Sequence, residues 1–186
     1  NITVKADAVV GTAIDVTKET STSVTLDKAG EGKFVQYTIP EDGFYRFKVS
    51  GTKEKTEAKE TEKAAVDAYL TNNLNDPYNI WLGAYHETPA KYNKGDVKYV
   101  YVSSVDDKVT VEIKVAKINV KDIKAGETPD TLSRDHSYYK FTAESDGKYT
   151  FDAKITERTG DDKDTTPNAE VKCVKGGEFD INHFDY

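Results

Sequence analysis

The feature that most constrains this chain is a phrase of eight residues that occurs twice. Residues 40–47 read PEDGFYRF and residues 144–151 read ESDGKYTF, so that Gly43 and Gly147 lie 104 positions apart. A repeat of this kind within 186 residues indicates two copies of one structural unit.

At the same offset, apolar and aromatic residues alternate with polar ones in both copies. The aligned positions are Val35, Tyr37, Ile39, Tyr45, Phe47 and Val49 in the first copy, and Tyr139, Phe141, Ala143, Tyr149, Phe151 and Ala153 in the second. A period of two marks strands with one buried face. The intervening Asp-Gly pair is typical of a tight turn, because glycine tolerates a positive φ. We therefore expect a β-hairpin in each copy and an all-β chain.

The repeat also predicts where the units begin and end. We assign residues 13–116 to a first β-sandwich module, closed by an alternating strand over 109–115, and residues 117–186 to a second, partial one. Residues 1–12 are expected to be the closing strand of a preceding module or a partner strand, because residues 2–4 (ITV) resemble residues 109–111 (VTV). Residues 54–65 contain helix-forming residues without an apolar stripe, which predicts a solvated loop with at most a turn or two of helix.

The second module contains too few strand patterns to match the first. After its repeated phrase only residues 171–174 (VKCV) resemble a strand, and such a half sandwich exposes its apolar face and its edges. Three explanations remain open: the chain is a piece of a longer one, the tail packs differently, or strands from elsewhere complete the module.

Composition excludes several classes of function. The net charge of -7, without a cluster of basic residues, argues against a nucleic-acid partner. A single cysteine, Cys173, excludes an internal disulfide. Because no apolar run is long enough to span a bilayer, we expect no membrane insertion. The chain lacks an initiating Met and a signal peptide, which is the pattern of a mature or excised product.

The order of these motifs resembles the bacterial pre-peptidase C-terminal domain and related repeats of secreted proteins. The residues that carry the resemblance are Tyr37, Gly43, Tyr45, Phe47, Asp67, Tyr69, Leu70, Gly95, Tyr99 and Tyr101, with Phe141, Gly147, Tyr149 and Phe151 in the second module. The resemblance implies a jelly-roll-like β-sandwich that is secreted or attached to the cell surface and is non-catalytic. It also implies that calcium or polymeric substrates are possible ligands. The charged insertion over 54–65 and the short second module depart from it.

No catalytic motif is present in the sequence. His86, His136 and His183 share no motif, and the patterns of metalloproteases, serine hydrolases and phosphate-binding loops are absent. Cys173 falls on the inward phase of its strand, which favours an inert buried thiol. We therefore expect no enzyme activity and no cofactor.

A weak calcium site is the first candidate for binding. Asp161, Asp162 and Asp164 place several carboxylates in one loop, and Ca²⁺ prefers oxygen ligands. The spacing of an EF-hand is absent, so a solvated acidic loop is the favoured interpretation.

Carbohydrate binding is the second candidate. In residues 79–85 (NIWLGAY), alternation places Trp81 and Tyr85 on one face, with Gly83 between them, and Tyr78 is nearby. Aromatic rings spaced along a strand can stack on sugar rings. The alternative is that Trp81 packs against a neighbouring module or covers Gly83.

The sequence as a whole predicts a non-catalytic β-sandwich repeat protein, secreted or on the cell surface, acting as a spacer, an adhesion element or a binding accessory. One alternative is a carbohydrate-binding accessory of a secreted enzyme, and another is a self-assembling surface subunit that exchanges strands. The expected partners are polysaccharide, another surface protein or neighbouring modules.

Overall fold

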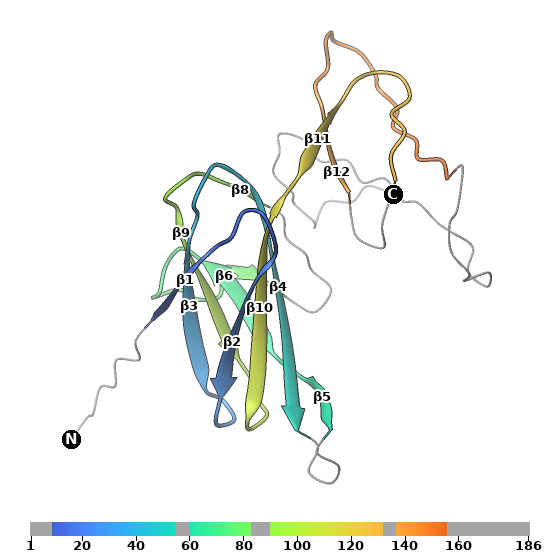
Figure 1. Cartoon of the computed structure of the whole chain (residues 1–186). Coiled ribbons are helices and arrows are strands. Elements are labelled where there is room, and N and C mark those ends of the chain that lie inside the picture. Colours follow the sequence, from blue (N-terminus) through green and yellow to red (C-terminus); the bar gives the residue numbers. More distant parts are fainter. Residues whose placement is uncertain (1–8, 55–59, 83–89, 132–136, 156–186) are drawn as a thin grey trace. The chain divides into compact units, whose positions relative to one another are not determined.

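The computed structural model describes residues 9–54, 60–82, 90–131 and 137–155 (Figure 1). These residues form strands, turns and loops, which confirms the predicted all-β class. Among them there is no helix that could span a membrane. The chain divides into two compact units, Asn1–Val120 and Lys121–Tyr186.

The first unit is a sandwich of two sheets (Figure 1). Sheet A has the order β1-β3-β9-β6-β7, formed by Val10–Ala13, Gly32–Thr38, Val97–Ser103, Asp67–Thr71 and Ile80–Trp81. Sheet B has the order β2-β10-β4-β5, formed by Thr20–Leu26, Val109–Ile118, Gly43–Glu54 and Thr61–Ala64, and β8 (Ala90–Tyr92) pairs with β4. Strand β1 runs parallel to β3, and the other neighbouring strands within these two sheets pair antiparallel.

The core lies between the two sheets and is built mainly from every second residue of β3, β4, β6, β9 and β10. The alternating residues of the predicted closing strand, from Val109 to Val115 in β10, are all buried. Aromatic rings join the layers: Tyr37 of sheet A meets Phe47 of sheet B edge to face, with ring centroids 5.7 Å apart. Phe47 in turn meets the ring of Tyr92 at 6.4 Å. Such edge-to-face pairs stabilise a core beyond the burial of their area.

The repeated phrase is not a hairpin, so this prediction was wrong. Strand β3 belongs to sheet A and β4 to sheet B, so residues 39–42 carry the chain across the core from one sheet to the other. The alternation was correct, but both strands point their apolar residues at the same core from opposite sides. Two facing strands and two paired strands therefore give the same sequence pattern. Gly43 is the first residue of β4 and does not have a positive φ.

A second crossing, from β8 in sheet B to β9 in sheet A, is tied to the first. The Asp42 carboxylate accepts a hydrogen bond of 2.7 Å from the Lys94 amide. The amide of Ile39 donates to the Asp96 carbonyl at 2.9 Å, and the Ile39 carbonyl accepts from the Gly95 amide at 2.8 Å. Gly95 has a φ of +89°, which glycine adopts without strain. The acidic residue of the repeated phrase therefore holds the other crossing in place.

A tyrosine fastens the first crossing, and the same contact recurs in the second unit. The hydroxyl of Tyr45 donates to the carbonyl of Glu41 at 2.9 Å, four residues upstream. At the offset of the repeat, the Tyr149 hydroxyl donates to the Ser145 carbonyl at 2.8 Å. This arrangement resembles the tyrosine corner of other β-sandwiches.

The pair of rings that joins the sheets of the first unit recurs as well. Phe141 and Phe151, which align with Tyr37 and Phe47, also meet edge to face, with centroids 5.3 Å apart. The sequence repeat is therefore accompanied by a repeat of local contacts, while a complete tandem module stays a prediction.

In the second unit, β11 (Val120–Ile123) pairs with β12 (Tyr138–Phe141). The Asp130 carboxylate links the two strands, because it accepts hydrogen bonds from Lys121 and from the Tyr139 hydroxyl. These donors, Lys121 first, lower the pKa of Asp130 to about 2. Residues 142–155 contain no strand, contrary to the expectation for Tyr149 to Ala153.

The predicted boundaries 1–12, 13–116 and 117–186 stay a prediction. Residues 1–8 lie outside the described residues, while Val10–Ala13 pairs with β3. The expected loop at 54–65 is partly wrong, because Thr61–Ala64 forms β5 against β4. Its charged side chains suit an edge strand with one solvated face.

We expect two of the buried tyrosines of the core, Tyr45 and Tyr37, to respond differently to loss of their hydroxyls. Tyr45→Phe removes the bond to Glu41 and should lower the free energy of unfolding by about 1 kcal/mol. The hydroxyls of Tyr37 and Thr22 are buried and make no hydrogen bond of normal geometry within the described residues. Tyr37→Phe should therefore leave stability unchanged or raise it. Urea unfolding of both variants measures the difference, and equal losses would contradict the assignment.

We also expect stability to fall in alkali. Burial raises the pKa of Tyr37 and of Tyr92 to about 12, from 10.0 for a free tyrosine. The folded state holds these protons more tightly, so their contribution is fully present below pH 10 and is lost as the pH rises toward 12. Each tyrosine contributes up to about 1.4 kcal/mol per pKa unit. Urea unfolding from pH 9 upward should show a shallower loss of stability in a Tyr37→Phe, Tyr92→Phe double variant than in the parent chain. Identical slopes would refute this origin.

Candidate binding face

The two outer faces of the first unit have different chemistry. Sheet B presents an ordinary solvated surface, in which Glu19 lies 3.8 Å from Arg46 and 3.7 Å from Lys114. Lys114 also lies 3.6 Å from Glu112, which accepts a hydrogen bond of 2.7 Å from the Ser21 hydroxyl. Exposed ion pairs of this kind contribute little to stability and keep a surface soluble.

Sheet A presents aromatic and neutral residues instead. The side chains that alternate with its buried ones are Phe34, Gln36, Thr38, Asp67, Tyr69, Trp81, Val97, Tyr99, Tyr101 and Ser103. Asp67 is the one charged residue among them, in a chain of which 32% is charged. An exposed apolar patch that contrasts with the rest of a surface marks an interaction site.

Four aromatic residues on this face form a continuous row across four adjacent strands. Phe34 of β3 is the register partner of Tyr101 of β9, and Tyr101 is the partner of Tyr69 of β6. Tyr69 is the partner of Trp81 of β7. Residues directly opposite each other in a sheet point to the same side. The rings of Phe34 and Tyr101 lie 4.9 Å apart between centroids.

Tyr78 joins this row from the loop before β7. Its ring lies 5.0 Å from that of Tyr69 and 5.9 Å from that of Tyr101, edge to face in both cases. Tyr78 is 63% exposed and Trp81 is 50% exposed, whereas the other three are half-buried. We name Phe34, Tyr69, Tyr78, Trp81 and Tyr101 the aromatic face.

The loop that carries Tyr78 is anchored at two points. The Thr71 hydroxyl donates to the Asp76 carbonyl at 2.8 Å. Lys98, whose side chain is almost buried, donates to the Asn72 side-chain oxygen at 2.6 Å and lies over the Tyr92 ring at 4.5 Å. Burial lowers the pKa of this lysine. The position of the loop is thus fixed by groups of the sheet beneath it.

A close approach at Gly32 allows Tyr101 to lie against β3. A Cβ at this position would overlap the tip of the Tyr101 ring and its hydroxyl. Burial raises the pKa of Tyr101, and its hydroxyl lies near those of Ser103 and Tyr78.

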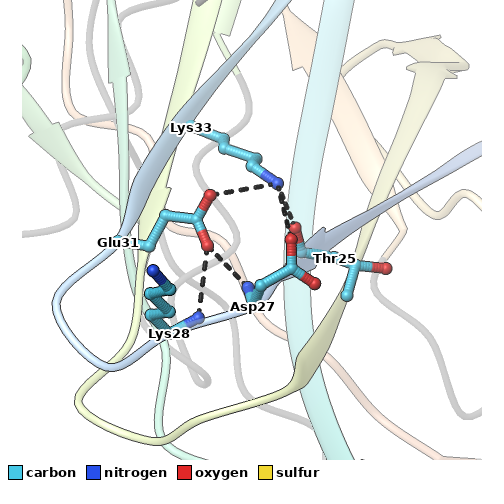
Figure 2. Close-up of polar contacts among 5 residues, drawn as sticks. All are labelled: Thr25, Asp27, Lys28, Glu31 and Lys33. Atoms are coloured by element: carbon cyan, nitrogen blue, oxygen red, sulfur yellow. Dashed lines mark hydrogen bonds and ion pairs between the residues drawn. The ribbon is translucent and has the colours of Figure 1, made fainter.

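The turn before β3 holds Gly32 in register (Figure 2). Glu31 accepts hydrogen bonds from the amides of Asp27, at 2.5 Å, and Lys28, at 3.3 Å, and lies 3.2 Å from the Lys33 ammonium. These contacts, the Asp27 amide first, lower the pKa of Glu31. Figure 2 shows Lys33 reaching back to the carbonyl of Thr25 as well.

The same turn is tied to the loop between β9 and β10. The amide of Gly30 donates to the Ser104 carbonyl at 2.7 Å, and the amide of Ala29 to the Asp107 carboxylate at 2.6 Å. Gly32 then pairs with Ser103, two residues from Tyr101. This polar cluster supports the strand on which the aromatic face is built.

The structure brings together two of the three residues predicted to contact sugar. Tyr78 and Trp81 both belong to the aromatic face, whereas Tyr85 lies outside the described residues. Strand β7 consists of Ile80–Trp81 alone. The aromatic neighbour of Trp81 in the described residues is therefore Tyr69 on the adjacent strand, and not a residue further along β7.

The other predicted candidates all lie outside the described residues. They are Asp161, Asp162 and Asp164 of the calcium loop, His86, His136 and His183, and Cys173. In the described parts of the chain, no three metal-ligating side chains gather in one place.

Sequence reasoning missed Phe34, Tyr69 and Tyr101 as members of a site. Each falls on the outward phase of a strand whose inward phase is apolar, which was a usable signal. Their alignment in one row depends on strand register, and no local pattern in the sequence encodes it.

Comparison with known proteins gives one related fold. No family model and no curated protein matches the chain. A solved structure of the pre-peptidase C-terminal domain of collagenase from Bacillus anthracis is 15% identical, with 60% of this chain and 99% of that domain covered and a TM-score of 0.38. The resemblance read from the sequence thus has a counterpart among solved structures.

We expect Gly32→Ala to disturb the aromatic face without unfolding the sandwich. The new methyl group meets the tip of a ring, which can move aside, so the loss in free energy of unfolding should stay below about 1 kcal/mol. NMR should show displaced ring resonances for Tyr101 and Phe34. Gly11→Ala in β1, where a Cβ meets nothing within 4 Å, is the matched control. Unchanged ring resonances in Gly32→Ala would contradict the close approach.

Proposed function

We propose that this chain is a non-catalytic accessory module that binds a polymer through the aromatic face. The observation that carries the proposal is the row of rings across β3, β9, β6 and β7. Trp81 at the end of the row and Tyr78 beside it are each at least half exposed. Tyrosine and tryptophan supply large contact areas with little loss of side-chain freedom, and they dominate many binding sites.

A secreted or surface location and the absence of enzyme activity belong to the same proposal. Support for the location comes from the resemblance read in the sequence. Support for a non-catalytic role comes from the sequence, which contains no motif for a nucleophile, a phosphate loop or a metalloprotease. The module would act by holding its parent protein on a surface.

Self-association is a second candidate function, favoured by the second unit. Tyr149 and Phe151 are each 39% exposed there, whereas the aligned Tyr45 and Phe47 of the first unit are fully buried. Light scattering as a function of concentration tests this function, and a constant mass would exclude it.

We expect the chain to adsorb to at least one insoluble polymer through the aromatic face. The test mixes the whole chain with cellulose, chitin, bacterial cell walls and insoluble gelatin, and measures the protein left in solution. A Tyr78→Ala, Trp81→Ala double variant should lose adsorption, because it removes the two most exposed rings of the face. Thr110→Ala, on the exposed side of β10, should adsorb as the parent chain does.

Thermal unfolding of each variant confirms that the sandwich is intact. Adsorption that survives in the double variant would move the site elsewhere, and no adsorption to any of the polymers would overturn the proposed function.

A further inference from the structure

We propose that the ligand of the aromatic face is a neutral polysaccharide whose chain lies across the strands of sheet A, from β3 to β7. This inference rests on the proposed function and names the class of polymer and its direction on the face.

The charge of the face selects a neutral ligand. Arg46 and Lys114, together with Glu19 and Glu112, lie on the opposite sheet. Asp67 is the one charged side chain among the outward residues of sheet A. An anionic polymer would meet this carboxylate with no cation to offset it among the outward residues of the described strands of sheet A, in a chain of net charge -7.

The register of the strands sets the direction of the chain. Neighbouring strands lie about 4.8 Å apart, so the row from Phe34 to Trp81 is about 14 Å long. The row is perpendicular to the strands because its members are register partners on successive strands. A pyranose ring is about as wide as a tyrosine ring, so the row offers room for more than one sugar along its length.

The chemistry of the row suits sugar rings better than a protein surface. The C–H groups on the face of a pyranose carry partial positive charge and pack on the electron-rich face of an aromatic ring. The sugar hydroxyls need partners at the edges, and Gln36, Tyr99 and Ser103 supply amide and hydroxyl groups on the same side of the sheet. A protein partner would bring charged side chains of both signs to a face whose described strand residues include no cation to receive its acids.

The exposed and half-buried rings have separate roles in this arrangement. Tyr78 and Trp81 present the contact surface, and Tyr69 and Tyr101 support Tyr78 from below at centroid distances of 5.0 and 5.9 Å. Tyr101 is half-buried, and this burial raises the pKa of its phenol.

The test uses the whole chain in affinity electrophoresis, in gels that contain one soluble polymer each. The neutral polymers are hydroxyethylcellulose, xyloglucan, galactomannan, laminarin and glycol chitin, and the anionic ones are polygalacturonate and hyaluronan. At least one neutral polymer should retard the chain. Trp81→Ala and Tyr78→Ala should each weaken the binding constant by roughly tenfold, the loss of one stacked ring. Thr110→Ala should bind unchanged, and binding should stay constant between pH 6 and pH 8.

The outcomes separate this inference from the proposed function. The inference is supported if a neutral polymer retards the parent chain and retards both the Trp81→Ala and the Tyr78→Ala variants much less. Adsorption to gelatin alone, lost in the Tyr78→Ala, Trp81→Ala variant, overturns the inference and leaves the proposed function standing. Equal retardation by anionic and neutral polymers overturns the selection by charge. No binding to any polymer overturns both.

Discussion

One end of the first unit depends on two of the several crossings of the chain between its sheets, and these two are bonded to each other. Residues 39–42 lead from sheet A to sheet B, and residues 93–96 lead back. The hydrogen bonds of Ile39 and Asp42 to the second crossing fix where β3, β4, β8 and β9 begin or end. The rings of Tyr37, Phe47 and Tyr92 then fill the space between the layers at this end. These contacts help to set the register of the strands at this end of both sheets.

Register is also what turns scattered aromatic residues into a binding face. Within β3, Phe34 and Tyr37 lie on opposite phases of the same strand, so one is part of the face and the other part of the core. A shift of one residue in the pairing of β3 with β9 would exchange these roles. The polar turn around Glu31 and the close approach at Gly32 oppose such a shift from the other end of the strand. The core and the face are therefore two results of one alignment.

The sequence was sufficient for the class of fold and for most of the core, because alternation reports burial directly. Val109 to Val115 and the first copy of the repeated phrase, with β3 before it and β4 within it, were read correctly as strands with a buried side, whereas the second copy forms no strand. The hairpin was read wrongly because alternation does not tell whether two strands pair or face each other. Trp81 and Tyr78 were predicted because both belong to one short aromatic stretch of the sequence, which can be recognised without knowing how the strands pair. Phe34, Tyr69 and Tyr101 were missed because their proximity depends on pairings between residues far apart in the chain.

The central position of the last two strands of the first unit has a consequence for biosynthesis. Strand β9 separates β3 from β6, and β10 separates β2 from β4, so neither sheet is continuous until both have been inserted. Leu26 of β2, for example, pairs with Val109, which is synthesised much later. At usual rates of translation, the intervening stretch takes about 4–17 s to emerge from the ribosome. During that time β2 and β4 are nascent chain without their shared partner. A topology with such distant contacts folds slowly, and its early strands depend on their hydroxyl-rich, charged outer residues to remain soluble.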